Sequence, residues 1–347
     1  MKLSEDRLRA LSVRALVRHG LREAAAVACA RKLVDADACG IETHGVSRVP
    51  MYCRMLQTGR IAGDAQPFLV DADADADAAA SAIVDAAGGI GYDACELAID
   101  TLAPRAGRHG VAFVGIRHST HVGALGLHLE PLAKVGLVGI ALSAAPAAMP
   151  FANGREPVLG TNPIAAIFPR PGEAPLLIDM SMTTVARGHI LLAAQRDEPI
   201  PEGWALDRQG QPTTDARAAL EGSLLPVGGE KGSLLALCFE LLCSALTGAV
   251  PGFMADPFYA DQGNAPRLGQ VFIAFDPGRL AGTRAYAERV ETIVERLCAD
   301  PAVRLPGSRR AASRDAAARD GISVPPALLE RIERLGALPN AAPDPPV

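Results

Sequence analysis

The residues with the clearest chemical potential lie in the segment from Gly40 to Arg48, GIETHGVSR, which follows a predicted helix. This segment places the hydroxyl of Thr43, the imidazole of His44 and the guanidinium of Arg48 close together. Imidazole titrates near neutral pH and donates a proton to an oxygen or nitrogen as a hydride arrives. Guanidinium binds a carboxylate through two hydrogen bonds. The segment therefore favours reduction of a carbonyl beside a carboxylate, and a histidine that caps a helix is the alternative.

A second candidate is Asp179, at the end of an apolar run that predicts a strand. A carboxylate in that place is costly to bury unless it is paired. Pairing with His44 would orient the imidazole and stabilise its charged form, as the His–Asp pair of hydrolases does. The alternative is an aspartate that caps the next turn.

A third candidate is the glycine-rich segment Gly228–Ser233, GGEKGS, which precedes an apolar stretch predicted to be helical. Glu230 and Lys231 stand at the expected beginning of that helix. Backbone amides and a lysine near a helix N-terminus make a suitable phosphate site. An ordinary glycine-rich connection is the alternative.

Two further loops carry polar residues after or before predicted strands. In RHSTHVGALG, His118 and His121 are three residues apart, which suggests a metal site, but no third ligand is evident. Otherwise this is a loop whose glycines let the backbone approach a ligand. In LGTNP, Thr161 and Asn162 fit either amide or ribose recognition or a turn that satisfies its own backbone.

Composition and motifs exclude several other classes of protein. With 49% hydrophobic and 21% charged residues, the 347-residue chain is globular, and a net charge of -5 without a basic block argues against nucleic acid. Seven cysteines without CxxC spacing indicate reduced thiols. The segment Gly89–Ala94 matches the Rossmann fingerprint only in part, because Ala94 replaces its third glycine. No P-loop, HExxH or GxSxG motif occurs, and no apolar leader or transmembrane stretch is present.

The elements that must position these residues are a mixture of helices and strands. Helices are expected at 4–18, 22–39, from about 49, 92–105, 126–134, 232–246 and 283–298, and strands at 82–85, 111–116, 135–142, 164–168, 176–178 and 271–275. Because they do not alternate strictly, the fold class is α/β with a mixed sheet. The acidic repeat at 71–80 predicts a solvated connector, and a Pro-rich tail starts at Pro339.

In this order the segments resemble the malate/L-lactate dehydrogenase family, nicotinamide-dependent oxidoreductases that lack the Rossmann fold. The most specific pieces are GIETHGVSRVPMY, RHSTHVGALG, LGTNPIA, LIDMSMTTVARGHI, IPEGWALDRQGQPTTD, LPVGGEKGS and RLPG. The resemblance covers about Leu3 to Leu335. It implies a mixed, mainly antiparallel cofactor sheet with a helical N-terminal and C-terminal domain. It also implies homodimers with active sites near the interface.

The resemblance also implies roles for single residues. His44 would be the proton donor, assisted by Thr43 and by Asp179 as its acidic partner. Arg48 would anchor the substrate carboxylate, and His121 would line the cleft beside substrate and cofactor. The residues implied to contact the cofactor are His121, Thr161, Asn162, Pro163, Leu177, Ile178, Asp179, Met180, Ser181, Glu230, Lys231, Gly307, Ser308 and Arg309.

Three residues depart from the family pattern. Thr43 replaces the usual Ser before the catalytic His and adds a methyl group. Ala144 lies where an Asn is common, which removes one polar contact to cofactor or substrate. His189 stands where many relatives have Lys, a change expected to alter the charge on the substrate side or the cofactor preference.

The expected function is interconversion of a small 2-oxo acid and its 2-hydroxy acid with NADH or NADPH, without a metal. The alternative is a cyclic ketimine reductase acting on Δ1-piperideine-2-carboxylate or Δ1-pyrroline-2-carboxylate. A non-catalytic binding protein is a third class, which retention of His44, Arg48, Asp179 and Lys231 disfavours. We expect a cytoplasmic protein with a helical substrate and dimerisation part, 1–105 with 295–347, and a cofactor-binding part, 106–294. A small anionic carboxylate is the expected partner, with no nucleic acid or membrane.

Overall fold

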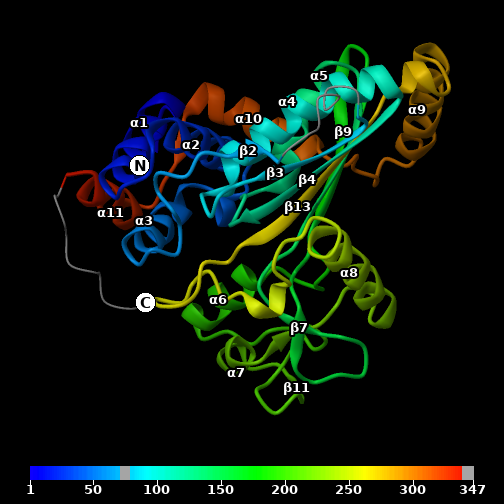
Figure 1. Cartoon of the computed structure of the whole chain (residues 1–347). Coiled ribbons are helices and arrows are strands. Elements are labelled where there is room, and N and C mark those ends of the chain that lie inside the picture. Colours follow the sequence, from blue (N-terminus) through cyan, green and yellow to red (C-terminus); the bar gives the residue numbers. More distant parts are fainter. Residues whose placement is uncertain (71–78, 338–347) are drawn as a thin grey trace.

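A computed structural model describes residues 1–70 and 79–337. The Pro-rich tail and most of the acidic repeat therefore lie outside the described residues. The centre of the molecule is a seven-stranded sheet (Figure 1). Its strands in spatial order are β2 (Phe68–Leu69), β3 (Ser81–Asp85), β4 (Val111–Ser119), β13 (Leu268–Phe275), β5 (Val138–Ser143), β8 (Ile164–Arg170) and β9 (Glu173–Met180).

The sheet is mixed and mainly antiparallel, which confirms the expected fold class. Strands β3 and β4 are parallel and are joined by helix α4 (Gly91–His109), while the other neighbouring pairs are antiparallel. Strand β13 comes from far along the chain and lies between β4 and β5. It is buried over most of its length because both faces of the sheet are covered there.

Helices from both ends of the chain pack together at one side of the sheet (Figure 1). They enclose a hydrophobic core that includes Leu8, Leu33, Tyr52 and Ile332. Ser4 caps the first of them through the amide of Arg7, as its place before an acidic turn indicates. The elements are β1 (Lys2–Leu3), α1 (Glu5–Arg18), α2 (Glu23–Ala38), α3 (Val49–Gln57), α10 (Ser308–Asp320), β14 (Ile322–Ser323) and α11 (Pro326–Ala337).

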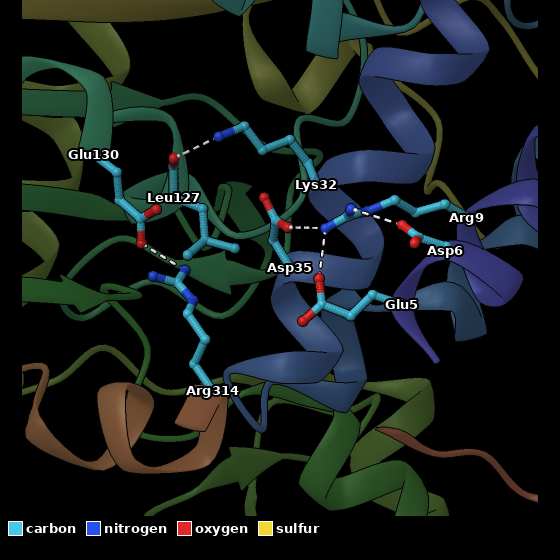
Figure 2. Close-up of polar contacts among 8 residues, drawn as sticks. All are labelled: Glu5, Asp6, Arg9, Lys32, Asp35, Leu127, Glu130 and Arg314. Atoms are coloured by element: carbon cyan, nitrogen blue, oxygen red, sulfur yellow. Dashed lines mark hydrogen bonds and ion pairs between the residues drawn. The ribbon is translucent and has the colours of Figure 1, made fainter. Parts of the chain in front are cut away.

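Polar contacts connect these helices to one another and to the sheet region (Figure 2). On α1, Arg9 binds Glu5 at 2.6 Å and Asp35 of α2 at 3.2 Å. From α10, Arg314 binds Glu130 at 2.7 Å. Glu130 begins α5 (Glu130–Lys134), which packs beside the sheet. These contacts fix α10, whose first turn enters the site described below.

A second lobe lies below the sheet in Figure 1 and is formed by the chain between β9 and β13, with one hairpin from the β5–β8 connection. Its core includes Met149, Ile190, Leu224 and Phe239. Its elements are β6 (Met149–Pro150), β7 (Pro157–Leu159), α6 (Arg187–Arg196), β10 (Ala205–Leu206), β11 (Pro212–Thr213), α7 (Ala216–Glu221), β12 (Ser223–Leu224), α8 (Glu230–Cys243) and η5 (Gly252–Met254).

Some expected elements differ from the structure. The helix expected at 126–134 is two pieces, η4 (Leu125–His128) and α5, because Pro131 starts a new helix more readily than it continues one. The strand expected from Val135 begins only at Val138, since Gly136 has a φ of 80°. Helix α9 (Thr283–Cys298), which follows η6 (Pro277–Arg279), has the expected bounds. Helices α6, α7, α10 and α11 were not expected.

The expected division of the chain at residue 106 stays a prediction. The central sheet takes β2 and β3 from before that position and the other five strands from after it. None of the described helices is both long and apolar enough to cross a membrane.

Candidate active site

The segment with His44 and Arg48 consists of two 3-10 turns, η1 (Glu42–His44) and η2 (Val46–Arg48), between α2 and α3. The carboxylate of Asp37 on α2 accepts a hydrogen bond of 2.8 Å from the amide of Val46. Gly45 permits this contact, because a Cβ there would lie 1.7 Å from the Asp37 carboxylate. A glycine and a buried carboxylate therefore hold the two turns in place.

His44 lies half-buried between a hydroxyl and a second imidazole. Its Nδ1 is 3.0 Å from the Thr43 hydroxyl, and its ring stacks on His121 with 5.7 Å between centroids and 19° between planes. Burial, together with the positive charges of Arg48 and Arg310, lowers the pKa of His44 to about 4. His44 is thus neutral near pH 7 while no anion is bound, and an anion beside it would favour its protonated form.

Arg48 lies beside His44 and carries its guanidinium against Tyr259. Its Nε donates to the carbonyl of Thr43 at 2.6 Å, and a terminal nitrogen donates to the Tyr259 hydroxyl. The guanidinium lies 5.0 Å from the centroid of the same ring. Sequence reasoning missed Tyr259, because nothing in its local sequence relates it to a residue 211 positions earlier.

The loop that carries Tyr259 is organised by a buried arginine. Arg60 is 1% exposed, and its guanidinium donates to the carbonyls of Asp256, Pro257, Ala260 and Asn264. The same loop places Phe258 edge-on against His121, with 5.1 Å between ring centroids. Arg60 therefore holds Tyr259 against Arg48 and Phe258 against His121.

The two histidines of the RHSTHVGALG segment have different partners. His121 hydrogen-bonds Tyr52 and lies against His44, whereas His118 binds Asp85 of the neighbouring strand β3 at 2.9 Å. Within the described ranges, no three His, Cys, Asp or Glu side chains are grouped so that they could hold a metal ion. His121 is thus brought to the predicted site, and His118 is not.

Asp179 pairs with Arg310 and not with His44. Its carboxylate accepts hydrogen bonds of 3.1 Å from the amide of Gly126 and 3.1 Å from the Arg310 guanidinium. Burial raises the pKa of Asp179, and Arg310 opposes that rise. Both Asp179 and His44 lie in the described part of the chain, and no hydrogen bond joins them. The expected direct pairing is therefore absent, because the first turn of α10 brings an arginine to the carboxylate.

The segments predicted to bind the cofactor come together around β9. The amide of Met182, just after β9, donates to the carbonyl of Thr161 at 2.8 Å, and the amide of Val227 donates to Met182 at 2.9 Å. At the other end, the amide of Leu177 approaches the carbonyl of Pro306 at 3.4 Å. Contacts at β9 thus reach Thr161, Val227 and Pro306, which lie in or next to the segments predicted to bind the cofactor.

Asn162 has a structural role in this arrangement. Its side chain is buried, donates to the carbonyl of Ala236 and to Glu240, and accepts from the amide of Ala145. The side chain has no free polar atom for a cofactor. A contact from Asn162 to the cofactor would therefore come from its backbone.

The remaining residues around β9 fit a nicotinamide dinucleotide. Ile178 and Met180 expose apolar side chains on the edge strand, which suits a flat ring. Gly228 and Gly229 both have a φ of 64°, and a Cβ on either would meet no atom within 4 Å. They lead directly into α8, where Glu230 and Lys231 are exposed. This is an open glycine turn at a helix N-terminus, which is suited to a phosphate group.

Comparison with known proteins identifies the family. The sequence profile described as malate/L-lactate dehydrogenase matches residues 3–333. The chain belongs to the malate/L-lactate dehydrogenase family. The predicted family is therefore confirmed.

Curated relatives within the family carry two kinds of name. The chain is 42% identical to a (2R)-3-sulfolactate dehydrogenase (NADP(+)) from Chromohalobacter salexigens, over 88% of this chain and 89% of the relative. It is 38% identical to a Δ1-pyrroline-2-carboxylate/Δ1-piperideine-2-carboxylate reductase from Pseudomonas aeruginosa, over 94% and 97%. The expectation of an oxidoreductase is thus confirmed at the level of the family.

A solved structure confirms the fold as well. The chain is similar to Δ1-piperideine-2-carboxylate reductase from Pseudomonas syringae pvar. tomato, with a TM-score of 0.89 and 35% identity, over 96% of this chain and 99% of that one.

The three departures from the family pattern lie in different surroundings. The added methyl of Thr43 faces Gly188 at the start of α6, where a Cβ would be only 3.1 Å from it. Ala144 is buried in the core of the second lobe. His189 is exposed on the first turn of α6. Only the methyl of Thr43 adds bulk next to His44.

Proposed function

We propose that this protein interconverts a small 2-oxo acid and its 2-hydroxy acid with NADH or NADPH. The observation that carries the proposal is the convergence of His44, Arg48 and His121, with 5.7 Å between the two imidazoles. A proton donor and a carboxylate anchor are groups that this reduction uses, and a second imidazole beside them adds a hydrogen-bonding group. When bound, the reduced nicotinamide would supply the hydride.

In this proposal Arg48 binds the substrate carboxylate through its guanidinium. The bound anion offsets the positive charge of Arg48, which is one of the causes that lower the His44 pKa. Binding therefore raises the pKa of His44 and prepares its imidazole to donate a proton to the carbonyl oxygen. Thr43 orients the same ring through Nδ1.

Asp179 acts in this proposal through Arg310. Its negative charge offsets the guanidinium that disfavours protonated His44. The cofactor would lie along β9, against Ile178 and Met180. Its phosphates would lie near the turn before α8. The proposed contacts are His121, Thr161, Asn162 (backbone), Pro163, Leu177, Ile178, Asp179, Met180, Ser181, Glu230, Lys231, Gly307, Ser308 and Arg309.

The second candidate is reduction of a cyclic ketimine carboxylate. The observation in its favour is that the solved relative with a TM-score of 0.89 is a Δ1-piperideine-2-carboxylate reductase. Hydride transfer and the carboxylate anchor would be the same, with C=N replacing C=O.

The test is the loss of reduced-nicotinamide absorbance with purified protein. NADH and NADPH are assayed in parallel with pyruvate, oxaloacetate, sulfopyruvate and the two cyclic imines. Turnover of an oxo acid supports the leading function, and preference for an imine replaces it with the second. Failure to bind either cofactor would contradict both.

We also propose a cytoplasmic homodimer. Its seven cysteines are all unpaired, which is typical of a reducing compartment. Helix α8 exposes an apolar face, with Leu234 49% and Leu241 53% exposed, and Leu246 just after the helix is 58% exposed; these residues surround a shallow hollow lined by leucines. Such a patch on a surface helix favours a protein interface.

A further inference from the structure

Three side chains next to His44 are joined in a row by hydrogen bonds. The hydroxyl of Tyr52 on α3 is 2.5 Å from Nδ1 of His121 and 2.9 Å from the hydroxyl of Tyr92 on α4. Both tyrosines are 0% exposed. The His44 ring stacks on the His121 ring. This row of hydrogen-bonded side chains thus extends from the hydrophobic core to His121, which contacts the proposed proton donor His44.

The direction of these hydrogen bonds follows from the number of protons that the two tyrosine hydroxyls have to donate. Each tyrosine hydroxyl has one proton to donate. Burial raises the pKa of both tyrosines, so both keep that proton. If Tyr92 donates to Tyr52 and Tyr52 donates to Nδ1, each proton has an acceptor.

The reverse direction leaves a proton without an acceptor. If Nδ1–H donated to Tyr52 and Tyr52 donated to Tyr92, the Tyr92 proton would need a further acceptor. Among the described residues, the Tyr92 hydroxyl has no hydrogen bond other than that with Tyr52, and the residue is closed to water. A buried donor without an acceptor is costly. The first direction is therefore favoured, and Nδ1 of His121 is an acceptor.

A neutral imidazole that accepts at Nδ1 carries its proton on Nε2. Burial holds the pKa of His121 well below its usual value, and Arg48 and His44 add to this effect, so the ring is neutral. Within the described chain, Nε2 makes no hydrogen bond, and His121 is only partly buried. The Nε2–H group is thus available to a ligand beside His44.

We propose that Tyr52 and Tyr92 are positioning residues that hold His121 as the neutral Nε2–H tautomer, so that it donates a hydrogen bond to the carbonyl oxygen of the bound 2-oxo acid. The proposal rests on the proposed function. It deepens that function, because Arg48 binds the carboxylate and the N–H donor is left for the carbonyl oxygen. The protonated ring nitrogen of a cyclic ketimine is itself a donor, and the Nε2–H group of His121 would offer it no acceptor. The Tyr pair therefore favours substrates that carry a carbonyl oxygen.

The tautomer is tested by nitrogen NMR of protein labelled with ¹⁵N-histidine, and the His121 signals are assigned by their loss in His121→Asn. An unprotonated Nδ1 and a protonated Nε2 in the unliganded wild type are expected. Tyr52→Phe and Tyr92→Phe should each shift the signals toward the other tautomer. A proton on Nδ1 in the wild type would overturn the proposal. This readout is independent of turnover, so it stands or fails apart from the proposed function.

The kinetic test compares substrates in the same variants. Tyr52→Phe is expected to lower kcat/KM for the oxo acid by about tenfold, the effect of losing one hydrogen bond, and to lower it less for a cyclic imine. Tyr286→Phe is the matched control, because its hydroxyl donates to the carbonyl of Pro169, away from the site. Equal loss for both substrates, or an equal loss in the control, would overturn the substrate preference. If Tyr52→Phe does not fold, Tyr92→Phe serves in both tests.

Discussion

The carboxylate of Asp179 lies 3.1 Å from a terminal nitrogen of Arg310, on the first turn of α10. This ion pair is largely buried, with 11% of the Asp179 side chain and 19% of the Arg310 side chain exposed. Arg310 is also one of the two charges that lower the pKa of His44. The aspartate and the histidine are therefore related through an arginine, which makes α10 part of the electrostatics of the site.

Replacement of Arg310 by Met should move the pH profile of reduction. The pKa of His44 is about 4, and removing one cation beside it raises that value. Reduction requires protonated His44, so kcat/KM falls as pH rises through this pKa, and the fall should shift to higher pH. Arg314→Met, one turn later on α10 and paired with Glu130, is the control. If the fall in kcat/KM stays at the same pH or moves to lower pH in Arg310→Met, Arg310 does not lower the pKa of His44.

Replacement of His44 by Ala should lower turnover by about two to four orders of magnitude, the usual contribution of general acid catalysis. Cofactor binding, followed by fluorescence of the reduced nicotinamide, should change little. His118→Gln is a matched control, because that histidine binds Asp85 outside the site. Wild-type turnover in His44→Ala would show that another group donates the proton.

Replacement of Arg48 by Lys should raise KM for the carboxylate substrate by about tenfold or more, with a smaller change in kcat. Lysine keeps the charge but loses the planar fork that also contacts Thr43 and Tyr259. Steady-state kinetics measure both constants. Arg54→Lys, on the helix α3 that follows Arg48 and paired with Asp261, is the control. An unchanged KM would make Arg48 a scaffold residue.

Replacement of Asp37 by Asn should change how stability depends on pH. Burial raises the pKa of Asp37 to about 7, against the hydrogen bond from Val46, and Glu42 adds to the rise. Because the folded-state pKa exceeds that of the unfolded chain, the contribution of Asp37 is complete below the unfolded value and is lost as pH rises through about 7.

The wild type should therefore lose about 1–3 kcal/mol of unfolding free energy between about pH 5 and about pH 8, in excess of any loss in Asp37→Asn. Urea denaturation of both proteins at both pH values measures this difference. Equal losses would indicate that Asp37 titrates normally in the folded protein.

Replacement of Leu241 by Asp should convert the proposed homodimer into a monomer. Leu241 lies on the exposed apolar face of α8, where a charge would be buried on association. Light scattering should give twice the chain mass of 36.0 kDa for the wild type and the single mass for the variant. Leu280→Asp, at another exposed leucine, is the control. A monomeric wild type would refute the dimer.

Local signals predicted the elements whose residues interact with near neighbours in sequence. Ser4 followed by two acidic residues predicted the start of α1, and apolar spacing predicted the bounds of α9. Helix α10 was missed, because it is rich in Ala and Arg and has no buried residue that would give an apolar period. Its place in the fold depends on contacts such as Arg314 with Glu130, and a local pattern does not reveal them.

By itself, the sequence determined that His44 and Arg48 share one short turn segment, because four residues of chain keep them near each other in any fold. It also carried the motifs that indicate the family. Only the tertiary structure decided their neighbours: Tyr259 is 211 residues from Arg48, Arg310 is 131 from Asp179, and His121 is 69 from Tyr52. Such pairs depend on sheet order and helix docking, which bring together side chains that no local spacing relates.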